Sequence, residues 1–409
     1  MRSGPRPELL ETDPDALLDA LEYLNGPRAD DNRDRWSSWL PVFSASFGAD
    51  HPRTSYVRLE VARWLAQTGD LAGGLRQQER ALDALRKVPS LFGPNPNIVV
   101  ARYEIADLQG QAGDVAGALS AIEQLLPEAL AQFGPDHPNT MRMRDSLAGW
   151  RAAVGDLAGS VKALEDVVAE SQRVFGPNHF ETLTSRQRLA SSRLVAGDAA
   201  RALAEFEQLL PAMTELLGPA DRWTLATRSG QADALGENGD PRGAVVTLEQ
   251  LVRDQARYLG PDHPDTLSTR MLLAYFLGKA GDPAAARFAY ADVVADQVRV
   301  LGPDHPVTLG TRRGLARSTG ESGDPVGART ALAALSADHL RVQGPDDPQT
   351  LRTREELARW TGEAGNPTAA VAALAALLHD QLRVLGPGHP RTAEIRKDLA
   401  RWQAAAESS

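Results

Sequence analysis

The sequence repeats itself with a period close to 42 residues. A loop signature reads Gly-Pro-Asp-His-Pro at Gly134, Gly260 and Gly302, and related versions recur along the chain. Its nine copies start at Gly48, Gly93, Gly134, Gly176, Gly218, Gly260, Gly302, Gly344 and Gly386, with spacings of 45, 41 and then 42 residues. A second breaker, Gly followed by Asp or Asn, divides each unit into two segments. A period of this length predicts a stacked array whose neighbouring units bury one another's apolar faces.

Both segments of a unit have the apolar periodicity of an amphipathic helix. In the unit that starts at Gly260, the first segment repeats apolar residues at Leu267, Leu273 and Leu277. The second segment does so at Ala286, Tyr290, Val293, Val294, Val298 and Leu301. Strand patterns are missing from the sequence, so each unit is predicted to be an antiparallel helical hairpin.

The residues between the segments fit the two ends of a helix. Gly302 is expected to take a left-handed conformation that closes one helix, and Pro306 suits the first turn of the next. Asp304 or His305 is then expected near the N-cap, where a polar side chain accepts an otherwise unpaired N–H. Pro89 is expected to interrupt a second segment.

Composition narrows the classes of function. The 409 residues include no cysteine, which excludes disulfides, thiolate nucleophiles and Cys-ligated metals. The formal net charge of −10 disfavours nucleic acid as a partner. No stretch approaches the about 20 apolar residues of a membrane span, so we expect a cytoplasmic protein that does not bind membranes. No nucleophile–base pair, phosphate loop or metal cluster stands out, and we expect neither a cofactor nor catalysis.

The repeated unit resembles the tetratricopeptide repeats of the kinesin light chain type over roughly residues 48–403, through Gly-Pro-Asp-His-Pro, Thr-Leu-x-x-Arg, Leu-Ala and Gly-Asp. The resemblance implies an all-α, right-handed superhelical solenoid of antiparallel helical hairpins, whose concave groove binds peptides or partner proteins. We expect a degenerate capping repeat at 1–47, with a helix from Asp13 to Leu24. Eight tandem repeats follow at 48–390, then a capping helix and frayed tail at 391–409. No unit keeps the Asn-Asn pair that follows the repeated arginine in this family.

Residues shared by all units are assigned to the scaffold. A first-helix arginine recurs as Arg58, Arg102, Arg144, Arg186, Arg228, Arg270, Arg312, Arg354 and Arg396. We expect its stem to be buried and its guanidinium to bind loop carbonyls, although a basic ladder for a phosphorylated or nucleic-acid ligand is the alternative. Thr266 and the threonines at the same position of most other units are expected in the first turn of their helices. The six loop histidines are too far apart to share a zinc ion, so no metal site is predicted.

Functional residues are sought where the units differ, at one and five residues after the repeated arginine. The predicted partner-binding groove consists of Tyr103, Asp107, Asp145, Gln187, Met271, Tyr275, Arg313, Arg317, Glu355 and Arg359. Trp223, in place of a loop proline, either anchors a partner or fills a gap. Beyond Met271 this stripe is rich in Arg and Lys, which predicts a protein or peptide partner with an acidic segment. The alternatives are a regulator that senses a short signalling peptide or small molecule, and an enzyme that uses Tyr103, Asp107 and Asp145.

Overall fold

Helices make up the described part of the chain, which in this computed structural model covers residues 29–67, 70–87, 96–384, 386–387 and 390–408. No strand occurs in these residues. The helices are α2 (Ala29–Phe47), α3 (Pro52–Gln67), α4 (Leu71–Lys87), α5 (Pro96–Gln111), α6 (Val115–Phe133), α7 (Pro138–Ala153), α8 (Leu157–Phe175), α9 (Phe180–Val195), α10 (Ala199–Leu217), α11 (Arg222–Glu237), α12 (Pro241–Tyr258), α13 (Pro264–Lys279), α14 (Pro283–Val300), α15 (Pro306–Glu321), α16 (Pro325–Val342), α17 (Pro348–Glu363), α18 (Pro367–Val384) and α19 (Pro390–Glu407). The predicted helix at Asp13–Leu24 and the predicted interruption at Pro89 lie outside the described residues.

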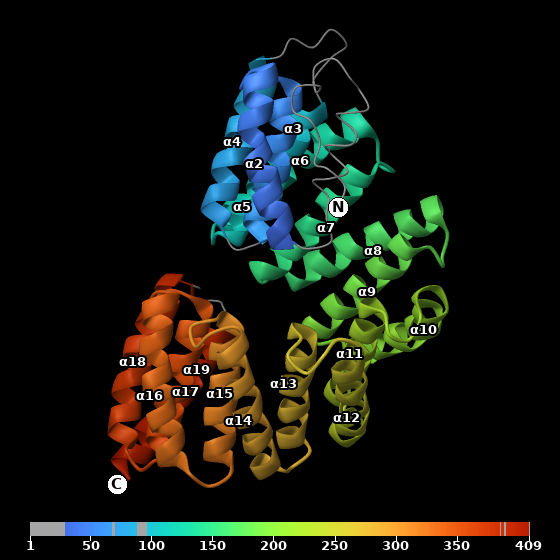
Figure 1. Cartoon of the computed structure of the whole chain (residues 1–409). Coiled ribbons are helices and arrows are strands. Elements are labelled where there is room, and N and C mark those ends of the chain that lie inside the picture. Colours follow the sequence, from blue (N-terminus) through green and yellow to red (C-terminus); the bar gives the residue numbers. More distant parts are fainter. Residues whose placement is uncertain (1–28, 68–69, 88–95, 385, 388–389, 409) are drawn as a thin grey trace. The chain divides into compact units, whose positions relative to one another are not determined.

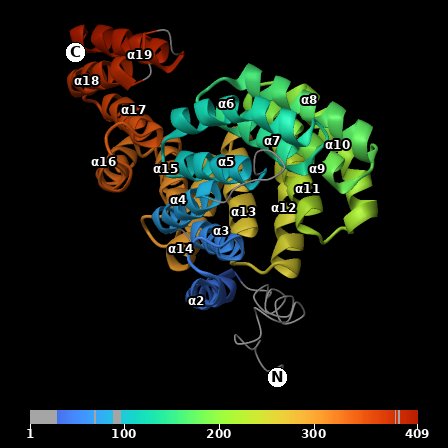
Figure 2. The ribbon, with the colours of Figure 1, turned by 90° about the horizontal axis from the view of Figure 1, so that it is seen from above.

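Consecutive helices pack in hairpin pairs, which confirms the predicted all-α fold class (Figure 1). The chain divides into two compact units, residues 1–197 and 198–409. In the second unit, α16 to α19 lie one beside the next in both views (Figures 1 and 2). The core runs from pair to pair, since Leu309 and Leu332 of one pair and Trp360 of the next belong to one buried cluster. No pair therefore has a closed core of its own.

The loop signature shapes the backbone between pairs. Gly302 has the predicted positive φ, at +92°. At Gly134, however, φ is 86° and ψ is 167°, so the backbone is extended rather than left-handed helical. This region is open in practice only to glycine, and it directs the chain away from the helix that has just ended.

In the first helices whose start is described, a histidine or aspartate of the signature caps the helix, and in several of them a threonine donates to the carbonyl of the loop glycine. His305 is the N-cap residue, and its Nδ1 accepts a hydrogen bond from the Val307 N–H at 3.3 Å. Asp347 takes this place in the following repeat and accepts from Gln349 N at 2.8 Å. Thr266 lies in the first turn of α13, as predicted, and donates to the Gly260 carbonyl at 2.9 Å. The five loop histidines in the described part of the chain are thus used as caps.

Six of the nine repeated arginines pair with a carboxylate of the second helix, so the prediction of loop carbonyls is wrong for them: Arg102, Arg144, Arg228, Arg270, Arg312 and Arg354. Arg58 donates instead to the amide oxygen of Gln77. Arg270 lies 2.7 Å from Asp296 of α14, and Arg312 lies 2.9 Å from Asp338 of α16. Arg299 of α14 adds a second cation to the Arg270–Asp296 pair. It lies 2.9 Å from Asp296 and 2.6 Å from the loop residue Asp262. A carboxylate that faces the guanidinium forms a charge-assisted bond, which is stronger than a bond to a neutral carbonyl.

The buried stripe of α14 runs through Gln297 instead of Val298. Gln297 is fully buried, whereas Val298 is 39% exposed, so the prediction that Val298 is buried is wrong. Twelve residues beyond Ala286, Val298 has rotated about 120° from the stripe in a helix of 3.6 residues per turn. Gln297 lies close to the line that passes through Ala286, Tyr290 and Val293, which are all buried.

Glycines in several first helices receive an aromatic ring from the next first helix. A Cβ atom added to Gly320 of α15 would lie 2.3 Å from the ring of Trp360 in α17. A Cβ atom added to Gly362 of α17 would likewise lie 2.6 Å from the ring of Trp402 in α19. These contacts fix how closely neighbouring first helices approach, and so they set the width of any cavity between them.

Candidate functional site

Three cavities lie between first helices of neighbouring pairs, and most of the predicted groove residues line them. We call the cavity in the first unit, of about 270 Å³, the N-terminal pocket. It is lined by Arg63 and Ala66 of α3, Gln78 of α4, Tyr103, Glu104, Asp107, Leu108 and Gln111 of α5, and Arg142 of α7. Tyr103 and Asp107 were predicted from the sequence to contact a partner.

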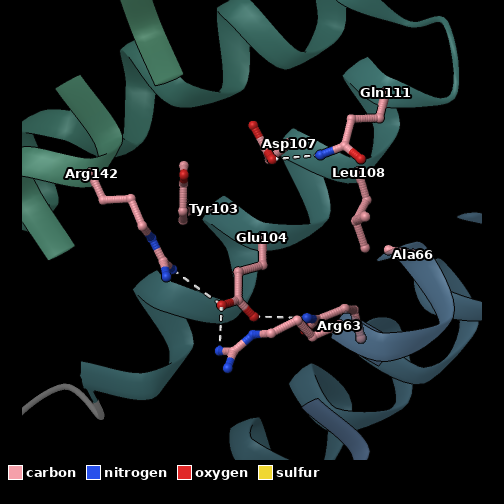
Figure 3. A pocket seen from close by; sticks show the side chains of 9 residues that line it. Arg63, Ala66, Tyr103, Glu104, Asp107, Leu108, Gln111 and Arg142 are labelled. Carbon is pink, nitrogen blue, oxygen red and sulfur yellow. Dashed lines mark hydrogen bonds and ion pairs between the residues drawn. The ribbon is translucent and has the colours of Figure 1, made fainter. Parts of the chain in front are cut away.

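Charged side chains at one side of the N-terminal pocket neutralise one another. Glu104 accepts from Gln78 at 2.7 Å and from Arg142 at 3.1 Å, and it lies 3.8 Å from Arg63 (Figure 3). The Arg142 guanidinium lies 5.0 Å from the centre of the Tyr103 ring. Tyr103 is only 4% exposed, and its hydroxyl shares a hydrogen bond of 2.7 Å with Ser146.

Asp107 lies at the other side of this pocket and has neutral partners. The Trp150 indole N–H donates to its Oδ1 at 3.0 Å. The Gln111 amide donates to its Oδ2 at 2.9 Å, as Figure 3 shows. No ion pair to Asp107 is found among the described residues. The pocket therefore holds one carboxylate whose charge is not compensated.

Two adjoining cavities in the second unit form what we call the arginine groove. Their volumes are about 200 and 410 Å³, and they share Tyr275, Tyr290 and Arg317. The lining consists of Met271, Leu272, Ala274, Tyr275, Gly278 and Lys279 of α13, Ala286 and Tyr290 of α14, Gly310, Arg313, Gly314, Arg317, Ser318 and Glu321 of α15, and Arg352, Glu356 and Arg359 of α17. The predicted residues Met271, Tyr275, Arg313, Arg317 and Arg359 are thus brought together.

Arg313 lies deepest among these cations, with 13% of its side chain exposed. It donates to Gln349 at 2.7 Å and lies 3.5 Å from Glu356, which is also 3.9 Å from Arg352. Burial, followed by the nearby charge of Arg352, lowers the pKa of Arg313 to about 10. The lowered pKa thus reflects chiefly the removal of this guanidinium from water and, after that, the nearby positive charge.

Two residues that line the arginine groove, Tyr275 and Lys279, also contact Glu237 of α11. The Tyr275 hydroxyl donates to Glu237 at 2.9 Å, and Lys279 lies 2.8 Å from it. Burial raises the pKa of Glu237, but the hydrogen bonds from Lys279 and Tyr275 outweigh it and leave the pKa below its usual value. Asp233 of the same helix lacks such donors, and burial together with the charge of Glu237 raises its pKa to about 6.

Four predicted residues line none of these three cavities. Asp145 pairs with Arg188, and Gln187 is buried at 8% exposed. Glu355 of α17 is also largely buried, and this burial raises its pKa. Trp223 is half-buried, with the Arg222 guanidinium 5.4 Å from its ring centre. Its role, as a partner anchor or as a gap filler, stays a prediction.

Sequence reasoning missed lining residues at two further repeat positions. Glu104, Gly314 and Glu356 all lie two residues after the repeated arginine, and Gly310 lies two before it. A cavity between two helices is bordered by a strip several residues wide on each, which two positions per repeat do not cover. The charge variation at these positions is the signal that would have identified them.

Comparison with protein families matches a tetratricopeptide repeat to residues 140–181, 266–307 and 350–391. The chain therefore contains tetratricopeptide repeats at these residues. The starts of the three matched repeats differ by whole multiples of 42 residues, which is the period of the loop signature. None of the curated proteins compared with the chain matches it.

Solved structures similar to this chain include a putative kinesin light chain protein with nearly identical tetratricopeptide-like repeats from Podospora anserina. It is 29% identical, and the match covers 51% of this chain and 98% of that one, with a TM-score of 0.43. A tetratricopeptide repeat protein from Parabacteroides merdae is 13% identical over 76% of this chain and 99% of that one, with a TM-score of 0.53. A Rap protein complexed with Competence and Sporulation Factor is 10% identical, covering 86% and 99%, with a TM-score of 0.52. The last two share the fold.

The described residues contain no group of three or more His, Asp or Glu side chains that could hold a metal ion. Every helix in this part of the chain is too short or too polar to cross a lipid bilayer. Tetratricopeptide repeats generally present extended concave surfaces to other proteins. The chemistry of the two cavity systems is therefore best considered as binding chemistry.

Proposed function

We propose that the chain is a non-catalytic scaffold whose arginine groove binds an acidic segment of a partner protein. The charge of the lining supports this proposal. Lys279, Arg313, Arg317, Arg352 and Arg359 line the two cavities together with Glu321 and Glu356. Glu237 pairs with Lys279, so five cations face three carboxylates. Clustered guanidinium groups present planar forks that match carboxylates, so an acidic side chain would supply the negative charge that the groove lacks.

The shape of the groove supports an extended or helical segment over a folded surface. Gly310 has no atom within 4 Å of an added Cβ, so the backbone of α15 is open at this point. The equivalent position carries Ser268 in the preceding repeat and Arg352 in the following one. Met271 and the rings of Tyr275 and Tyr290 add apolar surface beside the arginines. A segment that combines carboxylates with apolar side chains satisfies both parts of this lining.

The proposal is tested with an array of short peptides in which each Asp- or Glu-containing sequence is paired with its Asn or Gln version. The acidic members should bind preferentially, and the combined Arg313→Glu, Arg317→Glu and Arg359→Glu variant should weaken them by roughly tenfold or more. The matched control is the combined Arg201→Glu, Arg242→Glu and Arg253→Glu variant, which reverses the same number of charges at exposed residues of second helices. Equal binding by the two triple variants would refute the proposal.

A second variant tests the groove without changing its charge. Gly310→Leu places a side chain in open space between α13, α15 and α17, so the fold should persist while the smaller cavity is filled. The acidic peptides should bind less tightly to this variant. Unchanged binding by Gly310→Leu would show that the peptides lie elsewhere.

A further inference from the structure

The N-terminal pocket differs from the arginine groove in the sign of its unbalanced charge. Arg63 lies 3.1 Å from Glu60, and Arg63 and Arg142 both approach Glu104. These two cations therefore face two carboxylates before Asp107 is considered. Asp107 then adds a negative charge that receives hydrogen bonds only from the neutral Trp150 and Gln111 side chains. A bound group that completes the pocket must be positive.

A second acceptor in the pocket is also without a partner. Gln78 is 2% exposed, and its amide nitrogen donates to Glu104 at 2.7 Å. This donation fixes the orientation of the amide, because the opposite orientation would place its oxygen against the carboxylate. Its Oε1 is buried and has no hydrogen-bond partner among the described residues. A buried acceptor of this kind is costly unless a donor reaches it.

The remaining lining fits the stem of a long side chain. Leu108 and Ala66 contribute apolar surface between the two polar sides, and Figure 3 shows Asp107 with Gln111 on one side and Glu104 with both arginines on the other. The cavity volume of about 270 Å³ is large enough for an extended four-carbon or guanidinium-bearing side chain. We propose that the N-terminal pocket binds an arginine or lysine side chain of a partner polypeptide, with Asp107 as its counter-ion.

The Trp150 indole N–H reports directly on this site, because it donates to Asp107. In the full chain labelled with ¹⁵N-tryptophan, seven indole signals are expected, and Trp150→Phe assigns the relevant one. The probes are n-butylguanidinium, its neutral isostere n-butylurea, and two capped pentapeptides with a central arginine or citrulline. Both cationic probes should shift the Trp150 signal saturably, with affinities roughly tenfold or more above those of the neutral partners.

Two variants test the role of the charge. Asp107→Asn keeps an oxygen that accepts from Trp150 but removes the charge, and it should weaken the cationic probes by roughly tenfold or more. Asp233→Asn makes the same change at the equivalent repeat position of the other unit and should leave binding unchanged. Gln111→Glu, at an exposed position beside Asp107, should strengthen binding even if Asp107→Asn proves unstable.

Three results would overturn the proposal. The first is equal binding of n-butylurea and n-butylguanidinium, and the second is unchanged affinity in Asp107→Asn without any gain in Gln111→Glu. The third is binding of n-butylguanidinium but not of the arginine pentapeptide, which would assign the pocket to a small amine. Acidic peptides on the arginine groove are measured separately, so failure at one site leaves the other result intact.

Discussion

At the scale of single residues, Asp233 of α11 shows how burial of a carboxyl group changes both its pKa and the stability of the fold. Its pKa of about 6 lies above the ordinary value of 3.8 because of burial and the neighbouring Glu237. The folded state therefore holds this proton more tightly than the unfolded state does. The contribution of Asp233 to the free energy of unfolding is therefore largest below about pH 4 and is lost as the pH rises through about 6.

Asp233→Asn is accordingly expected to stabilise the protein near neutral pH. Removing the buried charge should gain roughly 1–2 kcal/mol, after allowance for solvent screening of a partly exposed group. At about pH 4, where the carboxyl is protonated in the folded state, the variant and the parent should unfold at similar temperatures. Thermal unfolding at the two pH values measures this, with Glu249→Gln as an exposed control. A gain that is the same at both pH values would contradict the assigned pKa.

The loop histidines offer a second residue-scale prediction. His305→Ala removes the acceptor for the Val307 N–H and should destabilise the protein by about 1 kcal/mol. His305→Asp should be tolerated, because Asp347 and Asp221 already cap the equivalent helices. Urea denaturation of the two variants tests the role of the cap. If alanine is as stable as aspartate, the histidine has another role.

The sequence separates scaffold from site at this scale, but it does not reveal every partner. Invariance along the array correctly placed Arg270 and Thr266 in the architecture. It could not show that Arg270 binds Asp296, because that carboxylate belongs to the other helix of the pair and the facing register depends on packing. The sequence predicted Glu355 in the groove, whereas its neighbour Glu356 lines the cavity. Adjacent residues on a helix point about 100° apart, so an error of one position changes the face.

At the scale of elements, the repeat determines helix boundaries while side-chain size determines helix spacing. Proline and glycine at fixed offsets allow the helices to be predicted closely. The fit between neighbouring first helices depends on pairs that the period does not show, such as Gly320 with Trp360. Gly278 is the equivalent of Gly320 in the preceding repeat, and a Cβ atom added to Gly278 would have no atom nearer than 3.6 Å.

These two glycines give opposite expectations for the same substitution. Gly320→Ala would place Cβ 2.3 Å from the Trp360 ring and should destabilise the protein by roughly 1–3 kcal/mol. Gly278→Ala meets only ordinary contact and should stabilise by up to about 1 kcal/mol, since alanine favours the helix. Chemical denaturation of both variants measures the difference. Similar effects at the two positions would show that the ring contact does not set the spacing.

At the scale of the whole molecule, one repeated framework carries cavities of different charge. The N-terminal pocket holds the uncompensated Asp107, whereas the arginine groove has five cations against three carboxylates, including Glu237. Both cavity systems lie where the repeats differ, and both are supported by residues that the repeats share. Binding of acidic peptides to the arginine groove should weaken with added salt, because its more exposed charges are screened.

Adjacent arginines of α15 test the separation of scaffold from site most directly. Arg312 is the repeated residue and pairs with Asp338 at 2.9 Å, whereas Arg313 varies between repeats and lines the arginine groove. The measurement is the unfolding free energy, together with the Kd for the tightest acidic peptide of the array, for Arg312→Ala and Arg313→Ala. We expect Arg312→Ala to lose stability and keep its affinity, and Arg313→Ala to lose affinity and keep its stability. The reverse pattern, or equal losses in both variants, would contradict the division between shared and varied residues.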